Sequence, residues 1–131
     1  MTINLNEALI LDDNQQSLDT MRRLATRCGY SAVCASSIKE FKTLYARNRP
    51  TVLVLDVVIG EDDCTAALEF LAQCRCAMPI VLVTGHAPQF LEIVEGQARE
   101  LGLKVAAKME KRKSLYKLED LLAELRIPEV E

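Results

Sequence analysis

Short apolar runs alternate along the chain with segments in which apolar residues recur every three or four positions. Five runs have the length and residue types of β-strands, at residues 8–11, 31–35, 51–58, 79–85 and 104–109. Helical spacing between and after them predicts five helices, of which the fourth covers about residues 88–101. Gly29 and Pro79 mark the expected ends of the first and third helices.

Polar residues stand where several of these helices should begin. Ser37 and Glu40 have the spacing of a capping box before the second helix. Ser114 is the expected N-cap of the last helix, and either Asp13 or Asn14 could cap the first.

Strands that alternate with helices predict βαβ units and a parallel sheet. The uninterrupted apolar sequences VLVL and IVLV indicate strands that are covered by helices on both faces of that sheet. The chain shows no internal repeat and no linker rich in Gly, Ser or Pro. We therefore expect one α/β domain over residues 1–131, with a doubly wound five-stranded sheet.

Composition excludes several classes of protein. Half of the 131 residues are apolar and 27% are charged, which is typical of a globular domain. The net charge of -3 argues against a nucleic-acid-binding face. No run of 18 apolar residues occurs and the N-terminal sequence has no signal-peptide pattern, so we expect no membrane contact and a cytoplasmic location.

Cysteine and histidine usage gives no sign of a structural metal or a disulfide framework. The five cysteines form no C-x-x-C pair, and His86 is the single histidine. We expect reduced thiols that pack mostly as small apolar groups.

Residues whose side chains could react or bind a ligand stand at the carboxyl ends of the predicted strands. They are Asp12 and Asp13 after the first strand, Asp56 on the third, Thr84 on the fourth, and Lys108 or Lys111 near the fifth. In an open parallel sheet these ends lie at one edge, where ligands bind. Three carboxylates, a hydroxyl and an ammonium should therefore converge on one cleft.

Each of these residues also has a structural explanation. Asp13 could simply cap a helix, Thr84 could be an ordinary strand end, and Asp56 could cap the segment that follows it. Their joint placement favours a site, because clustered carboxylates repel one another and need a cation to stay ionised together. Mg²⁺ suits such a set of oxygen ligands.

The segments LILDDN, VLVLDVV with a later DDC, PIVLVTGH and a late lysine before the last helix resemble the receiver domains of bacterial two-component response regulators. The resemblance covers nearly the whole chain. It implies the flavodoxin-like (βα)5 fold with strand order 2-1-3-4-5. It also implies that Mg²⁺ is held by Asp12, Asp13, Asp56 and the backbone carbonyl of Val58.

The chemistry that the resemblance implies is phosphoryl transfer from a sensor histidine kinase, a phosphotransfer protein or a small phosphodonor to Asp56. The late lysine would pair with the phosphoryl oxygens and the Thr84 hydroxyl would move toward them. That movement would switch a partner-binding face formed by the fourth helix, fifth strand and fifth helix. Such a domain modifies only itself and is not otherwise an enzyme. It would act on an unknown output domain or protein, and a homodimer is a further possible partner.

The choice between the two lysines rests on spacing. In the family a capping residue often follows the lysine by three positions and a core leucine by seven. Lys111 has Ser114 and Leu118 at those positions, whereas Lys108 matches only the leucine, with Leu115. The distance from Thr84 favours Lys108, but we expect Lys111.

The sequence departs from the family pattern at two places, and two other functional classes remain as alternatives. Neither lysine is followed by proline, and Ile59 and Gly60 stand where the family usually has a Leu-Pro or Met-Pro pair. Residues 84–105 also resemble receivers joined to EAL-type cyclic-di-GMP phosphodiesterases. A phosphorylation-independent pseudo-receiver is the main alternative. A flavodoxin-like or dehalogenase-like enzyme is a weaker one, because no phosphate-binding glycine loop occurs and position 58 is valine.

Overall fold

The computed structural model describes residues 2–131, apart from the side chains of Asp62 and Asp63. The strands are β1 (Glu7–Leu11), β2 (Ser31–Ala35), β3 (Val52–Asp56), β4 (Val58–Ile59), β5 (Asp62–Asp63), β6 (Ile80–Thr84) and β7 (Val105–Glu110). The helices are α1 (Gln15–Arg27), α2 (Ile38–Arg47), α3 (Thr65–Gln73), α4 (Gln89–Glu100), α5 (Lys111–Ser114) and α6 (Tyr116–Leu125).

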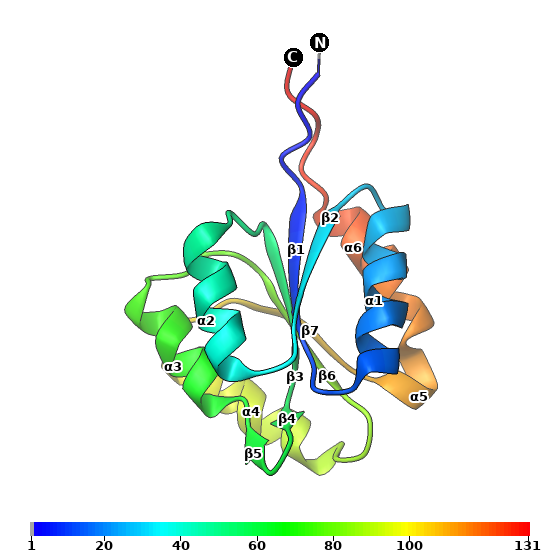
Figure 1. Ribbon diagram of the computed structural model, residues 1–131. Helices are drawn as coiled ribbons and strands as arrows, with labels where there is room; N and C mark the ends of the chain where they lie inside the picture. Colours follow the sequence, from blue (N-terminus) through cyan, green and yellow to red (C-terminus); the bar gives the residue numbers. More distant parts are fainter. Residues whose placement is uncertain (1) are drawn as a thin grey trace.

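Five of the strands form a parallel sheet in the order β2-β1-β3-β6-β7. Since β6 and β7 are the fourth and fifth strands of this sheet, the order expected from the resemblance is confirmed. Helices α2, α3 and α4 cover one face, and α1, α5 and α6 cover the other (Figure 1). The molecule is therefore the doubly wound α/β fold expected from the sequence.

Apolar side chains divide between the two faces by the alternation of the strands. Leu9, Leu53 and Leu82 point to the side of α2, α3 and α4, whereas their neighbours Ile10 and Val54 face α1 and α6. All residues of β3 and β6 are buried. These two central strands can be continuous apolar runs because neither face meets water.

The third strand is shorter than the sequence predicts. It ends at Asp56, and Val58–Ile59 instead pairs antiparallel with Asp62–Asp63 in a small separate hairpin. Gly60, with a φ of 63°, lies in the turn of this hairpin. The run continues to look like a strand in the sequence because apolar residues extend to Ile59.

Two helix boundaries also differ from expectation. Helix α3 ends at Gln73, well before Pro79, because Arg75 adopts a left-handed φ of 54° and the Cys76 N–H returns to the Leu71 carbonyl. Ser114 is not an N-cap: it lies in the short helix α5, and its hydroxyl donates to the Glu110 carbonyl.

The start of α2 agrees better with the sequence prediction. Ser37 accepts a hydrogen bond from the Glu40 N–H, as a capping box requires, although the Glu40 carboxylate returns to the Ser36 N–H instead. Across residues 2–131, no helix combines the length and the apolar character needed to cross a bilayer.

The two ends of the chain run side by side away from the amino ends of the strands (Figure 1). The buried Asn6 side chain accepts from the Ile127 N–H and donates to the Ile127 carbonyl, both at 2.7 Å. Asn6 thereby fixes the segment that follows α6 against the start of β1.

Candidate functional site

Three carboxylates meet at the carboxyl edge of the sheet. Asp12 directly follows β1 and Asp56 ends β3, and these neighbouring strands pair with Leu11 opposite Leu55. One oxygen each from Asp12, Asp13 and Asp56 lies within 4.8 Å of the others. Asp12 and Asp56 are 0% and 6% exposed, whereas Asp13 is exposed. Buried carboxylates this close need a cationic partner.

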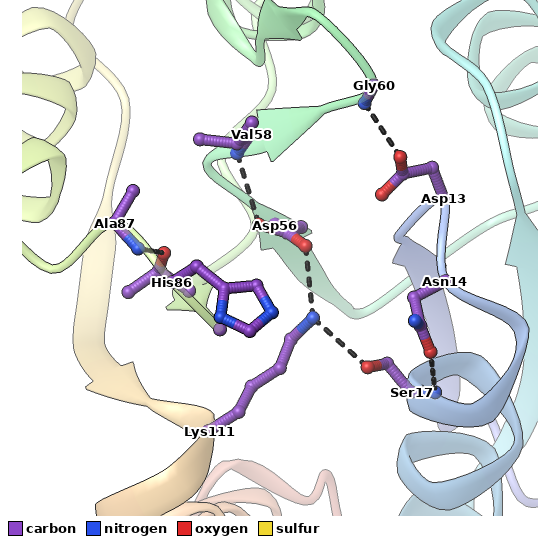
Figure 2. A pocket seen from close by; sticks show the side chains of 11 residues that line it. Asp13, Asn14, Ser17, Asp56, Val58, Gly60, His86, Ala87 and Lys111 are labelled. Carbon is purple, nitrogen blue, oxygen red and sulfur yellow. Dashed lines mark hydrogen bonds and ion pairs between the residues drawn. The ribbon is translucent and has the colours of Figure 1, made fainter.

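Lys111 supplies a positive charge to this cluster. Its Nζ lies 3.0 Å from Asp56 Oδ2 and also donates to Asp12 Oδ2 and, at 3.2 Å, to Ser17 Oγ. Figure 2 shows the Lys111 side chain reaching from the start of α5 to Asp56 and Ser17. Only 12% of the side chain is exposed.

Lys108 lies elsewhere. It is paired in β7 with Leu82, which faces the side of α4, and its ammonium bonds Glu95 of α4 at 2.8 Å. Lys111, beyond the strand, is therefore the lysine that contacts the carboxylates.

Thr84, the last residue of β6, lines the same cavity as Asp56 and is 1% exposed. Its hydroxyl accepts a hydrogen bond of 3.1 Å from the Ala87 N–H. The cavity has a volume of about 340 Å³ and includes Asp13, Val58 and Lys111 in its lining. Asp13, Asp56, Thr84 and Lys111 thus line one cavity, whereas Asp12 lies buried behind it and contacts Lys111.

Backbone N–H groups hold Asp56 and Asp13, and a neighbouring residue caps α1. The Val58 N–H donates to Asp56 Oδ1 at 3.1 Å, and the Gly60 N–H donates to Asp13 Oδ2 at 2.8 Å. Asn14, and not Asp13, is the N-cap of α1, since its side chain accepts from the Ser17 N–H. Asp13 is consequently available to the site.

Burial and the neighbouring charges shift the pKa values of Asp56 and Lys111 in opposite directions. Burial raises the pKa of Asp56 to about 6, although the Val58 N–H and Lys111 act to lower it. Burial lowers the pKa of Lys111, but its bonds and charge interactions with Asp12 and Asp56 outweigh this and leave the pKa above its ordinary value. Lys111 is therefore a permanent cation, and Asp56 is a carboxylate that is only partly compensated.

The sequence analysis missed three residues at this site. Ser17 contacts Lys111, and His86 lines the cavity, with its Nδ1 3.4 Å from a guanidinium nitrogen of Arg112. His86 directly follows Thr84–Gly85 and Arg112 directly follows Lys111, so adjacency was an available signal. Ser17 stands one helical turn after Asp13 and Asn14, which was the only hint of its position.

The fold and this edge define a doubly wound α/β domain with a lysine-paired acidic cluster. The sequence pattern of the response regulator receiver domain matches residues 8–116. This chain therefore belongs to the family of response regulator receiver domains of two-component systems.

Curated relatives agree with this assignment. The alginate biosynthesis transcriptional regulatory protein AlgB of Pseudomonas syringae pv. tomato is 31% identical over 97% of this chain, and that of Pseudomonas putida is 30% identical over 95%. The chain spans 31% of the length of each of these relatives.

Solved structures show the same fold. A response regulator receiver domain protein from Clostridium thermocellum has a TM-score of 0.75 at 17% identity, with 92% of this chain and 94% of that chain covered. A CheY-like receiver domain protein from Methanospirillum hungatei has a TM-score of 0.71 at 25% identity, with 92% and 96% covered.

Proposed function

We propose that this chain is a phosphoacceptor receiver in which Asp56 accepts a phosphoryl group from a histidine kinase, a phosphotransfer protein or a small phosphodonor. The observation that carries the proposal is the position of Asp56. Its carboxylate is buried at the end of β3, opens onto the cavity, and lies beside the Lys111 ammonium and two further carboxylates. We also propose that residues 1–131 form one domain.

The donor set fits a hard divalent cation. Three carboxylates with oxygens within 4.8 Å, one of them exposed, match the preference of Mg²⁺ for a few oxygen ligands and retained waters. We propose Asp12, Asp13, Asp56 and the Val58 carbonyl as ligands. The response regulator protein TrrA from Thermotoga maritima has this fold, with a TM-score of 0.75 and 13% identity over 92% of this chain and 98% of its own. It was solved in complex with Mg²⁺ and BeF. Mg²⁺ would offset the negative charge that the carboxylates and phosphoryl oxygens bring together.

The transfer itself needs little from the protein beyond positioning. A carboxylate oxygen of Asp56 attacks phosphorus, the bond from phosphorus to the donor nitrogen or oxygen breaks, and the electron pair leaves with the donor. We propose that Lys111 pairs with a phosphoryl oxygen, which its 3.0 Å contact with Asp56 supports. The Thr84 hydroxyl could turn from the Ala87 N–H toward another, which would pull on the loop that leads into α4.

That loop leads into α4, and both α4 and α6 carry exposed apolar side chains. Phe90 and Ile93 of α4 are 42% and 56% exposed, and Tyr116 of α6 is 69% exposed. We propose the face of α4, β7 and α6 as the surface where phosphorylation changes partner binding, including possible pairing of two copies.

The proposal gives a class of role for the domain but does not identify its output partner. The AlgB relatives are named as transcriptional regulators, and this chain matches less than a third of their length. We propose a cytoplasmic signalling role, without nucleic-acid or membrane binding by this domain and without enzymatic activity on other substrates. The link to an EAL-type output stays a prediction.

Intact mass measurement after exposure to acetyl phosphate and Mg²⁺ tests the proposal. The wild-type chain should gain one phosphoryl mass, and Asp56→Asn should gain none. Asp19→Asn, which removes an exposed carboxylate from α1, is the matched control and should be labelled like wild type. Labelling of Asp56→Asn at another carboxylate would contradict the assignment, and no labelling of wild type would favour the pseudo-receiver.

A further inference from the structure

A closed ring of hydrogen bonds joins the start of α1 to the Lys111 ammonium. Asp12 Oδ1 accepts from the Asn14 N–H at 2.9 Å, and Asn14 Oδ1 accepts from the Ser17 N–H at 2.9 Å. Ser17 Oγ accepts from Lys111 Nζ at 3.2 Å, and Lys111 returns to Asp12 Oδ2. The ring holds the Ser17 backbone in place, so its hydroxyl is presented to Lys111 from a fixed helix end.

Ser17 is the neutral one of the three groups that accept from this ammonium. An ammonium has three protons to donate, and Lys111 directs its other contacts to Asp12 and Asp56. Both of those carboxylates belong to the proposed cation site. A divalent cation there would repel the ammonium and compete with it for Asp12 and Asp56, but it would not compete for Ser17.

A second cavity gives Lys111 an alternative place to go. This outer cavity of about 290 Å³ adjoins the acidic one and is lined by Gln16, Thr20 and Arg112 in addition to shared residues. Ser17 and Lys111 line both cavities and so stand at their boundary. An ammonium displaced from Asp12 could swing outward into the outer cavity unless something holds it.

We propose that Ser17 is a positioning residue that keeps Lys111 beside Asp56 when a divalent cation occupies the acidic cluster. The inference rests on the proposed function, because it assigns Lys111 to the phosphoryl group. It adds a requirement for a hydroxyl at position 17, set by the helix cap at Asn14.

The kinetic test compares phosphorylation rates with acetyl phosphate and Mg²⁺. Ser17→Ala should lower the rate constant by about tenfold, the size expected for one hydrogen bond to a charged group. Ser17→Thr retains the hydroxyl and should restore most of the rate. Thr26→Ala removes a hydroxyl from the last turn of α1, outside both cavities, and should leave the rate unchanged. Equal rates for Ser17→Ala and wild type would overturn the inference, as would a failure of Ser17→Thr to recover.

A spectroscopic test does not depend on phosphorylation. In protein labelled with ¹³C and ¹⁵N at lysine, Lys111→Arg assigns the Lys111 side-chain signals. On addition of Mg²⁺, these signals should stay narrow and distinct in wild type but move toward those of exposed lysines in Ser17→Ala. Identical spectra in the two proteins would contradict the inference. If wild type accepts no phosphoryl group, the proposed function fails, whereas the spectra still decide whether Ser17 holds Lys111.

Discussion

The two ends of the sheet both bury polar side chains, but they do so in opposite ways. At the amino end, Asn6 is 2% exposed and exchanges two hydrogen bonds with Ile127, and the Tyr30 hydroxyl donates to the Leu122 carbonyl. These groups are neutral and paired. At the carboxyl end, Asp12 and Asp56 are buried as carboxylates around one ammonium.

The difference separates groups that hold the fold from groups to which we assign the proposed chemistry. A buried neutral pair is costly to break, because each partner loses its hydrogen bond away from water. A cluster of like charges is held together by the surrounding fold and costs stability until a ligand neutralises it. Substitutions at the amino end should therefore reduce stability and spare activity, and substitutions at the carboxyl end should do the reverse.

The largest effect on stability should come from placing a charge at the amino end. Asn6→Asp keeps an acceptor for the Ile127 N–H but sets a carboxylate oxygen against the Ile127 carbonyl, and should cost about 2 to 4 kcal/mol at pH 8. Asn6→Ala should cost about 1 to 3 kcal/mol, because it leaves the Ile127 N–H and carbonyl without their hydrogen-bond partner. Urea unfolding measures both. Phosphorylation of the folded fraction at Asp56 should stay normal, and a loss there would show that the two ends are not separable.

The second effect is a gain in stability at the carboxyl end. The pKa of Asp56 is raised to about 6 in the folded chain, against roughly 3.9 when unfolded. The folded state therefore binds the proton more tightly, so the stabilising contribution is complete below about pH 4 and is lost as pH rises through about 6. Asp56→Asn removes this loss. In EDTA it should exceed wild type in stability by about 2 to 3 kcal/mol at pH 8, with little difference near pH 4.

Unfolding curves of the two proteins at several pH values check this prediction. A constant difference between pH 4 and pH 8 would show that Asp56 does not carry the shift. A variant less stable than wild type at pH 8 would show that the ion pair with Lys111 outweighs the burial of the charge.

The sequence predicted the strand-end residues of the carboxyl end well and the position of the lysine less well. Asp12, Asp56 and Thr84 could be placed because the carboxyl ends of parallel strands share one edge, whatever the details of packing. Lys111 was chosen by its spacing to Ser114 and Leu118, but which lysine reaches the site depends on where β7 ends and on its register against β6, which is irregular near Ile80. The expected cap at Ser114 was wrong, so spacing alone gave incomplete support for that choice.

Other features could not be read from the chain because tertiary contacts decide them. The contact between Ser17 and Lys111 joins residues 94 positions apart, and the pairing of Asn6 with Ile127 joins residues 121 positions apart. The β4–β5 hairpin was hidden because apolar residues run on past Asp56. Periodicity reports which face is buried, but not which strand a residue joins.

The third effect concerns the ligand that should relieve the acidic cluster. Mg²⁺ at ten times its dissociation constant should stabilise wild type by about 1.4 kcal/mol. We expect Asp13→Ala to lose this gain, because both oxygens of Asp12 already accept from Asn14 and Lys111 while Asp13 is exposed. Thermal unfolding with and without Mg²⁺ measures the gain, with Asp19→Ala as the control. Full stabilisation of Asp13→Ala would place the cation elsewhere.

The smallest effect tests whether the amino end is as free of strain as its buried pairs suggest. Arg75, two residues past the end of α3, has a φ of 54°, and its N–H donates to the Ala72 carbonyl. A side chain in this left-handed conformation costs about 1 kcal/mol, which glycine avoids. Glycine also loses more backbone entropy on folding, so Arg75→Gly should gain only about 0.5 kcal/mol.

Arg75→Ala is the matched control, because it removes the same exposed side chain but keeps the Cβ atom and the strain. It should therefore remain near wild type in urea unfolding while Arg75→Gly becomes more stable. Equal stability of the glycine and alanine variants would mean that the strain of the left-handed turn is no larger than the backbone entropy that glycine loses on folding. In that case strain at Arg75 would not weaken the contrast between the two ends of the sheet.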